Sequence, residues 1–292
     1  MNMATGGEAS MPLDRDGVLK GVRNLPSLPA VVIELLQSME DDDADTRQLA
    51  GKLARDQALS AKVLRVANSS FYGLQGKVES IGDAIVVLGL HGLRTLATAA
   101  AVTDVFATKR GGEHGYDLPA FWRHSIATGL CAKEMARHSR MNEGNAFAAG
   151  LLHDIGRLAL ASCFPKHLAA VSQECAASGD CWLFAERRVL GLDHAEIGQI
   201  LTEHWRFPLL LSRAIGTHHD PDMQQDRLAT LIHVADGLAH RLDMIAGNQA
   251  PVALPPVDAA AWSVVGLDNE SARELVAVVE QQFESACDAL VS

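Results

Sequence analysis

Apolar residues in this chain recur at helical spacing, and nowhere do apolar and polar residues alternate for long enough to form a half-buried β-strand. Within residues 31–39, for example, one side of a helix would carry Val31, Val32, Leu35, Leu36 and Met39. Ala, Leu and Val are abundant and aromatic residues make up only 5%, which also favours helices over strands. The sequence therefore predicts an all-α fold built as a helical bundle.

Size and charge limit the classes of protein to consider. A chain of 292 residues forms one large domain or two modest ones, and 48% hydrophobic residues suffice for a buried core, which excludes a disordered chain. The 36 acidic residues outnumber the 25 basic ones, which gives a formal charge of −11. Such a chain repels a phosphate backbone, so no direct nucleic-acid binding is expected.

The sequence contains no evident targeting or membrane segment. Residues 1–16 lack a basic region followed by an apolar stretch, and long uncharged stretches such as 244–257 are too short and too rich in Pro to cross a bilayer. We therefore expect a cytoplasmic protein without membrane contact. Its five cysteines show no C-x-x-C spacing, so we expect reduced, buried side chains rather than disulfides or zinc ligands.

Breaks in the helical pattern divide the chain. Residues 1–17 lack any period and are expected to be a loose tail, after which Ser27 is a candidate N-cap. The charged, Gly-rich segment 109–115 is the clearest linker, and the Pro-rich segment 251–256 is a second connector. We expect a turn over 89–92 and helices over 85–88, 93–106, 119–139, 145–161, 166–178, 182–190, 194–205, 208–217, 227–241 and 269–290.

The doublet His153-Asp154 is the most informative polar feature, because it interrupts an apolar helical run. Burying an imidazole beside a carboxylate is costly unless another group compensates. A metal ion is one such group, because both side chains are good ligands and a carboxylate can bridge two ions. A buried His–Asp hydrogen bond or a helix cap would explain the doublet equally well.

Further histidines and an acid occupy similar positions in other helices. His218 and His219 end a predicted helix before a proline, where surface histidines favoured by the helix dipole are the alternative to ligands. His194 lies in a first helical turn, where a polar residue without a function is the more common outcome. His124 and Asp236 lie in apolar runs, where a core histidine and a paired acid are the ordinary outcomes. Spacing alone does not show that these residues converge.

The order His, His-Asp, His, His-His, Asp resembles the metal-dependent phosphohydrolase superfamily named for its His-Asp doublet, and most closely its HDOD subfamily of bacterial signalling modules. The N-terminal part of that resemblance lies in Leu25-Pro26-Ser27-Leu28-Pro29, Ala67-Asn68-Ser69-Ser70-Phe71-Tyr72-Gly73, Ser80-Ile81-Gly82-Asp83-Ala84-Ile85 and Gly89-Leu90-His91-Gly92-Leu93-Arg94. It covers about residues 21–242 and implies a two-lobed all-α fold. The expected parts are a tail (1–17), an N-terminal helical lobe (18–110), a metal-binding core (111–250) and a connector and helix packing on that core (251–292).

The resemblance also implies a set of metal ligands. The superfamily's first metal site corresponds to His124, His153, Asp154 and Asp236, and its second site corresponds to Asp154, as a bridging ligand, with His194, His218 and His219. Many HDOD members have lost part of this set, whereas this chain keeps a suitable residue at every position. The implied cofactor is a divalent transition metal, two ions per chain, with Fe, Mn, Zn and Ni all suited to these ligands.

Two differences from the phosphodiesterase relatives bear on activity. Arg157 stands where those relatives have a lysine after the doublet; it keeps the positive charge but has a different reach. The Gly-Tyr-Pro loop of the relatives that hydrolyse cyclic di-GMP is absent, because Asp220-Pro221-Asp222 follows the tandem histidines. Cyclic di-GMP is therefore not assigned as a substrate.

The resemblance leaves two functions open. The first is a signal-transduction module that acts through protein–protein contacts and retains a metal site, with signalling proteins as partners and a homodimer as an option. The second is a metal-dependent phosphohydrolase acting on a nucleotide or another phosphoester. In the second case Asp154 would bridge two ions that activate a water molecule, and Arg157 would stabilise the phosphoryl charge.

Overall fold

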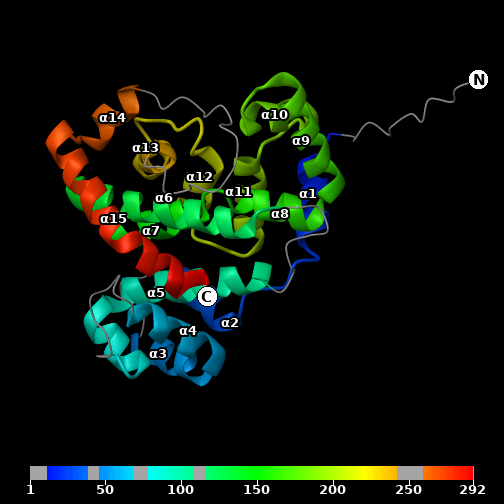
Figure 1. The fold of residues 1–292 in the computed structure, drawn as a ribbon. Coiled ribbons are helices and arrows are strands. Elements are labelled where there is room, and N and C mark those ends of the chain that lie inside the picture. Colours follow the sequence, from blue (N-terminus) through cyan, green and yellow to red (C-terminus); the bar gives the residue numbers. More distant parts are fainter. Residues whose placement is uncertain (1–11, 39–45, 69–77, 108–115, 242–258, 292) are drawn as a thin grey trace, which may run out of the picture.

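A computed structural model describes residues 12–38, 46–68, 78–107, 116–241 and 259–291, and helices without any β-strand make up this part of the chain (Figure 1). The prediction of an all-α fold is confirmed. The helices are α1 (Arg15–Val22), α2 (Ala30–Gln37), α3 (Thr46–Arg55), α4 (Gln57–Ala67), α5 (Ile81–Ala107), α6 (Leu118–His138), α7 (Glu143–Leu152), α8 (Ile155–Cys163), α9 (Pro165–Ser178), α10 (Trp182–Leu190), α11 (His194–His204), α12 (Leu209–Thr217), α13 (Arg227–Arg241), α14 (Ala259–Val265) and α15 (Asn269–Val291).

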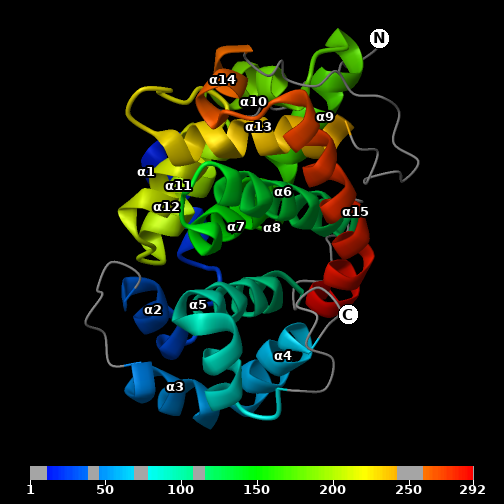
Figure 2. The ribbon, with the colours of Figure 1, turned by 90° about the vertical axis from the view of Figure 1, so that its left-hand side faces the viewer.

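The helices form two lobes, as Figure 2 shows. The smaller lobe consists of α2–α5, and the larger one is built around α6, α7, α8, α11, α12 and α13. The long C-terminal helix α15 runs along both lobes, packing on α6 in the larger lobe and on α4 and α5 in the smaller one. The lobes are therefore held together by α15 as well as by the contact between α5 and α7.

The N-terminal segment differs from the expected tail. Helix α1 begins at Arg15, inside the segment predicted to be loose, and it packs against α11 and α8 of the larger lobe. The carboxylate of Asp14 accepts a hydrogen bond from the backbone N–H of Gly17 and so caps this helix. Val18 and Val22, four residues apart, are both buried. This spacing was the sequence signal for α1.

Most helix positions agree with the sequence analysis, with three further differences. The proposed cap Ser27 is wrong, because Pro29 takes the N-cap position of α2. The helix expected over 145–161 is two helices, α7 and α8, which are broken at His153 and Asp154. Helix α14 was not predicted. The expected turn near residue 89 is present, because Gly89 bends α5 with a φ of 69°, a value that suits glycine. The linker at 109–115 and the connector at 251–256 lie outside the described residues.

Two close approaches between helices depend on glycine. A side chain at Gly150 in α7 would lie 2.9 Å from the carbonyl oxygen of Thr128, so its absence lets α7 pack tightly on α6. A side chain at Gly156 in α8 would overlap the carbonyl oxygen of His194, so α8 meets the start of α11 without any side chain between them. These glycines therefore bring the doublet at the end of α7 close to His124 and His194.

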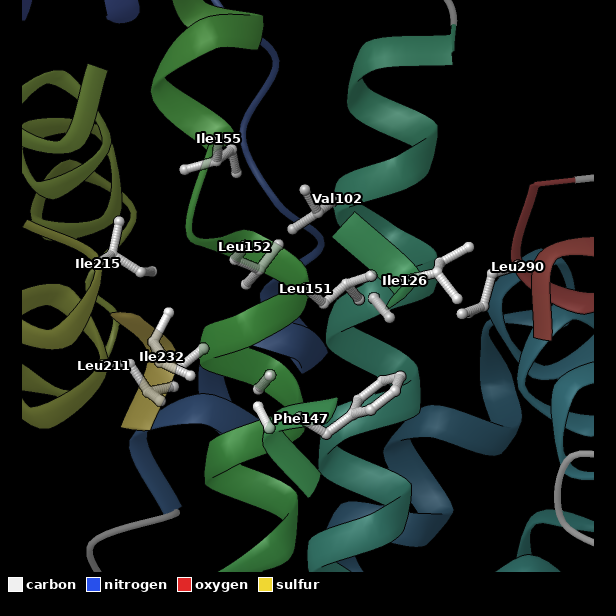
Figure 3. Close-up of a cluster of buried hydrophobic side chains, with 14 of the residues drawn as sticks. Val102, Ile126, Phe147, Leu151, Leu152, Ile155, Leu211, Ile215, Ile232 and Leu290 are labelled. Carbon is white, nitrogen blue, oxygen red and sulfur yellow. The ribbon is translucent and has the colours of Figure 1, made fainter. Parts of the chain in front are cut away.

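The apolar core is continuous between the two lobes. Figure 3 shows part of it: side chains of α7 lie at the centre, with those of α5, α6, α12, α13 and α15 around them. The labelled residues are Val102, Ile126, Phe147, Leu151, Leu152, Ile155, Leu211, Ile215, Ile232 and Leu290. Helix α7 is thus packed against several helices, and close packing limits how far the doublet at its end can move.

The predictions for cysteines and membrane segments are tested as well. All five cysteines are free thiols. Cys131, Cys181 and Cys287 are buried, as expected, whereas Cys163 and Cys175 are partly exposed. Among the described helices none is by itself both long and apolar enough to cross a bilayer, although two sharply bent helix pairs, one within α5 and one over α7–α9, reach the required length and composition together.

Candidate metal centre

The doublet meets α6 and α13 on one side. His124 of α6 places its Nε2 atom 3.0 Å from Oδ1 of Asp236, which α13 supplies. Nε2 of His153 lies 3.6 Å from the same oxygen and 3.6 Å from Oδ2 of Asp154. All of these side chains are buried. We refer to His124, His153, Asp154 and Asp236 as the α13 ligand group.

A second group forms on the other side of Asp154. Its Oδ1 atom lies 2.9 Å from Nε2 of His194 and 3.9 Å from Nε2 of His218. His219 places its own Nε2 2.8 Å from that of His194. These residues come from the start of α11 and the end of α12, helices that pack on each other. We refer to Asp154, His194, His218 and His219 as the α11–α12 ligand group.

Asp154 is therefore the residue shared by the two groups, with Oδ2 facing the α13 ligand group and Oδ1 facing the α11–α12 ligand group. Arg157, one turn later in α8, places a guanidinium nitrogen 3.2 Å from Oδ2. The sequence-predicted residues thus converge on one carboxylate. Spacing along the chain did not establish this convergence.

Backbone and carboxylate oxygens orient the imidazole rings. Nδ1 of His153 donates to the carbonyl oxygen of Gly150 at 2.8 Å, and Nδ1 of His218 donates to that of Ile215 at 2.7 Å. Since a carbonyl oxygen only accepts, each Nδ1 carries the ring proton. In the neutral ring of His218, Nε2 then presents a lone pair toward Asp154, which is the arrangement of a histidine that binds a metal. Burial would lower the pKa of His153 as well, but Asp154 and Asp236 raise it, so a cation would displace a proton from its Nε2.

The carboxylates in the centre are ionised. Burial would raise the pKa of Asp154, but Arg157 and the neighbouring imidazoles hold it well below its ordinary value. Burial would also raise the pKa of Asp236, but the imidazoles of His124 and His153 that face its carboxylate hold it well below the ordinary value. Two buried negative charges therefore lie among the imidazole nitrogens.

The histidines of the α11–α12 ligand group differ in charge. Burial lowers the pKa of His218 to about 3 and that of His219 well below its ordinary value, so both rings are neutral. Burial would also lower the pKa of His194, but Glu186 and Asp154 on either side of the ring raise it to about 10. Without a cation, the ring of His194 is therefore protonated on both nitrogens, with Nδ1 facing Glu186 and Nε2 facing Asp154.

The polar atoms of the centre fit a bound cation. Several are buried without any partner in hydrogen-bond geometry: Nε2 of His124, His153 and His218, and Oδ1 of Asp154 and Asp236. Leaving so many buried polar atoms unsatisfied is costly, and a cation that accepts their lone pairs would remove this cost. Asp154, His194, His218 and His219 offer ligand atoms that all lie within 4.8 Å of one another, as do His124, His153 and Asp154.

The competing interpretations of the doublet, and the surface interpretation of His218, do not agree with this geometry. A separation of 3.6 Å is too long for a His153–Asp154 hydrogen bond, and Asp154 precedes α8 without capping it through its side chain. His218 is fully buried, so it is not a surface residue, whereas its neighbour His219 is partly exposed. The buried His/Asp cluster could hold a metal ion.

Two residues near the centre were missed by the sequence analysis. Glu186 of α10 is fully buried, and its Oε2 atom accepts hydrogen bonds from the backbone N–H of His194 at 2.9 Å and from the ring Nδ1 at 2.5 Å. His240 of α13 lies 3.4 Å from Asp236, and burial lowers its pKa to about 4. Its spacing of four residues from Asp236 was a usable signal. Glu186, by contrast, looked like part of a solvated Glu-Arg-Arg face.

Arg187 links the two segments that carry the α11–α12 ligand group. Arg187 donates from Nε to Asp193, the N-cap of α11, at 2.8 Å, and it forms an ion pair with Asp220, which follows the tandem histidines. Helix α10 thus contacts His194 inside the centre through Glu186. Outside the centre it connects Asp193 to Asp220 through Arg187.

The HDOD domain family matches residues 25–221 of this chain. The chain belongs to the HDOD family. The match takes in the smaller lobe, the doublet and the tandem histidines, whereas Asp236 and His240 lie beyond its end. The resemblance found in the motifs is thereby confirmed.

Solved structures support the family assignment over the whole fold. An HDOD domain protein of unknown function from Geobacter sulfurreducens is 26% identical with a TM-score of 0.76, and the match covers 95% of this chain and 98% of that protein. A Shewanella amazonensis protein inferred to be a phosphohydrolase is 29% identical with a TM-score of 0.74, and the match covers 94% of this chain and 97% of that protein.

A comparison with curated proteins gives a match to an uncharacterised Treponema pallidum protein, which is 23% identical over 201 residues. The match covers 68% of this chain but only 38% of that protein's length.

Proposed function

We propose that this chain is a metal-dependent phosphohydrolase that acts on a phosphoester, with two divalent cations held on either side of Asp154. The observation that carries the proposal is the position of this carboxylate, whose Oδ2 and Oδ1 atoms face two different ligand groups. A carboxylate shared in this way is the usual bridge of a two-metal hydrolytic site. The similarity to the Shewanella amazonensis protein agrees with this class of reaction.

The side chains of the chain have separate roles in this proposal. The cations would supply Lewis acidity toward a phosphoryl oxygen and lower the pKa of a water molecule. Arg157 is partly exposed beside Asp154, so its guanidinium can pair with a phosphoryl oxygen and orient the substrate. Its fixed planar shape suits a phosphate group, although its reach differs from that of lysine.

The ligand chemistry narrows the choice of metal. The two groups offer imidazole nitrogens and carboxylate oxygens and no thiolate, which suits Fe, Mn, Zn or Ni rather than Mg or Ca. Of the residues around the centre, Arg157, His219 and His240 are partly exposed, whereas His153, His194 and His218 are buried. A substrate would therefore reach the centre past one or more of these partly exposed residues.

Hydrolysis by the full chain tests the proposal. Protein loaded with Mn²⁺ would be assayed against p-nitrophenyl phosphate, its diester and a set of nucleotides, beside His153→Ala/Asp154→Ala and the exposed-surface control His204→Ala. We expect turnover that falls by about 10³-fold or more in the double variant and is unchanged in the control. Turnover no greater than that of the double variant, for every substrate, would contradict the proposal.

A second function, signal transduction through protein contacts, has its own support. The family match begins at residue 25, so the smaller lobe belongs to the matched region, although none of its described residues lies in either ligand group. The same lobe exposes Val86 and Val87 of α5, by 85% and 45% of their surface. Because the smaller lobe supplies no metal ligand from its described residues, we infer that its exposed apolar side chains bind another protein.

Surface variants distinguish this second function from catalysis. Proteins retained from a cell extract by the full chain would be compared with those retained by Val86→Asp in the smaller lobe and by Leu209→Asp, an exposed leucine of the larger lobe. The signalling function predicts that only Val86→Asp loses a specific partner while its metal content stays unchanged. Identical retention by all three proteins would count against it.

A further inference from the structure

His240 extends the α13 ligand group beyond the residues carried over from the family. It lies in the last turn of α13, four residues after Asp236, with its Nε2 atom 3.4 Å from Oδ1 of that residue. Its ring stacks on that of His124, with the centroids 4.3 Å apart and the planes at 28°. His124, Asp236 and His240 each offer one ligand atom, and these atoms lie within 4.8 Å of one another.

Oδ1 of Asp236 is the point on which these rings converge. Nε2 atoms surround it at 3.0 Å from His124, 3.6 Å from His153 and 3.4 Å from His240. A carboxylate oxygen cannot accept good hydrogen bonds from three rings at once at these distances, and Oδ1 has no partner in hydrogen-bond geometry. Nε2 and Nδ1 of the buried His124 also lack such a partner.

Spacing along α13 also suits joint binding of one cation. Residues four apart lie on the same face of a helix, one turn from each other, so Asp236 and His240 present their side chains in the same direction. Pairs of ligands at this spacing on one helix are a recurrent way to hold a metal. The ring of His240 is partly exposed, whereas Asp236 is buried, so His240 lies on the outer side of the pair.

We propose that His240 is a further protein ligand of the cation held by the α13 ligand group. The inference rests on the proposed function only in requiring that this cation binds. The position would then have three imidazoles and two carboxylates, against three imidazoles and one carboxylate in the α11–α12 ligand group. We expect the α13 position to bind its cation more tightly for this reason.

Titration of the metal-free full chain with Co²⁺ tests the role of His240, since both affinity and the visible absorption of Co²⁺ report on its ligands. The variants are His240→Ala; His240→Gln, which keeps most of the side-chain volume if the alanine variant folds poorly; His219→Ala for the other ligand group; and the control His204→Ala. We expect both His240 variants to weaken one of two binding events about tenfold or more and to change its absorption band. His219→Ala should weaken the other event and His204→Ala neither.

Each other outcome has a separate meaning. Wild-type affinity and an unchanged spectrum in both His240 variants would overturn the inference while leaving the proposed function intact. Failure of the wild-type chain to bind Co²⁺ would overturn both. Normal Co²⁺ binding that depends on His240, in a protein that hydrolyses no phosphoester, would overturn the proposed function alone.

Discussion

Asp154 combines complete burial with an ionised carboxylate, and its surroundings explain how both are possible. Arg157 and His194 offset the cost of burial by lying within hydrogen-bond distance of its two oxygens. Gly156, two residues later, allows α8 to approach α11 closely enough for this contact. The centre therefore requires a residue without a side chain at position 156 as well as its set of ligands.

Replacement of Gly156 tests this requirement. The added methyl group of Gly156→Ala would overlap the carbonyl oxygen of His194, so we expect a loss of about 1–3 kcal/mol in the free energy of unfolding and weaker metal binding. Gly51→Ala is the matched control, because nothing lies within 4 Å of its new methyl group and alanine favours the helix by up to about 1 kcal/mol. Urea unfolding measures the free energy of unfolding of both variants. Equal effects of the two substitutions would contradict the account.

The protonation of His194 predicts how metal binding depends on pH. Its pKa is raised to about 10, so below that pH the metal-free ring carries a proton that a cation must displace. We therefore expect binding at pH 7 to release about one proton from His194, and the affinity of the α11–α12 ligand group to rise about tenfold per pH unit up to about pH 10. His218, with a pKa of about 3, should release none.

Calorimetric titration with Mn²⁺ in buffers of different ionisation enthalpy measures this proton release. An observed binding enthalpy that is independent of the buffer, together with an affinity that is flat from pH 7 to 9, would contradict the assignment of the proton to His194.

Residues in recognisable patterns were predictable, and residues defined by their surroundings were not. The doublet and the tandem histidines stand out as polar groups in apolar helical runs, so their importance could be inferred before their convergence was known. Glu186 has no such signal: it lies among charged residues, and only the packing of α10 beside α11 places its side chain inside the protein.

At the scale of elements, α10 shows how one helix supports a ligand group without supplying a ligand. Glu186 faces inward and fixes the ring of His194, while Arg187 joins Asp193 to Asp220 across the outside. The carboxylate at Nδ1 sets the tautomer and orientation of a metal-binding histidine. The start of α11 and the end of α12 are thereby held at a fixed separation.

Adjacent arginines allow a matched test of this support. Arg187→Gln removes the link between Asp193 and Asp220, so we expect cation affinity at the α11–α12 ligand group to fall about tenfold, with the α13 ligand group little affected. Arg188→Gln is the control, because Arg188 is also about half exposed but pairs with Glu174 and Asp180 away from the centre. Competition with a metal-sensitive dye gives both affinities. An equal loss in both variants would show that α10 acts only through general stability.

The helix boundaries show what periodicity can and cannot predict. Helices α10 and α13 were predicted with the bounds that the structure has. The break between α7 and α8 was missed because the apolar helical pattern continues on both sides of the doublet. At this break Gly156 lies against the backbone of His194, a tertiary contact that no local pattern contains.

At the scale of the molecule, the centre joins helices from distant parts of the chain. Its ligands come from α6, the α7–α8 break, α11, α12 and α13, so a bound cation connects much of the larger lobe. The two-lobed arrangement is present as the family resemblance implied (Figure 2). Residues 18–22, which the sequence analysis placed with the N-terminal lobe, belong to α1, and this helix packs on α8 and α11 of the larger lobe.

Removal of the cations should destabilise the whole fold. A ligand that binds only the folded state, at a free concentration a hundredfold above its dissociation constant, contributes about 2.7 kcal/mol. We therefore expect a chelator to lower the midpoint of thermal unfolding in the wild-type chain and to have little effect on His153→Ala/Asp154→Ala. Scanning calorimetry measures this difference. The same midpoint with and without chelator in the wild-type chain would contradict a cation contribution to stability.

The central claim, that Asp154 lies between two cations, is tested most directly by anomalous X-ray scattering from crystals of the full chain grown with Mn²⁺. The account predicts two anomalous peaks, one beside Oδ2 among His124, His153 and Asp236, and one beside Oδ1 among His194, His218 and His219. A single peak, or peaks elsewhere with Asp154 unliganded, would contradict it.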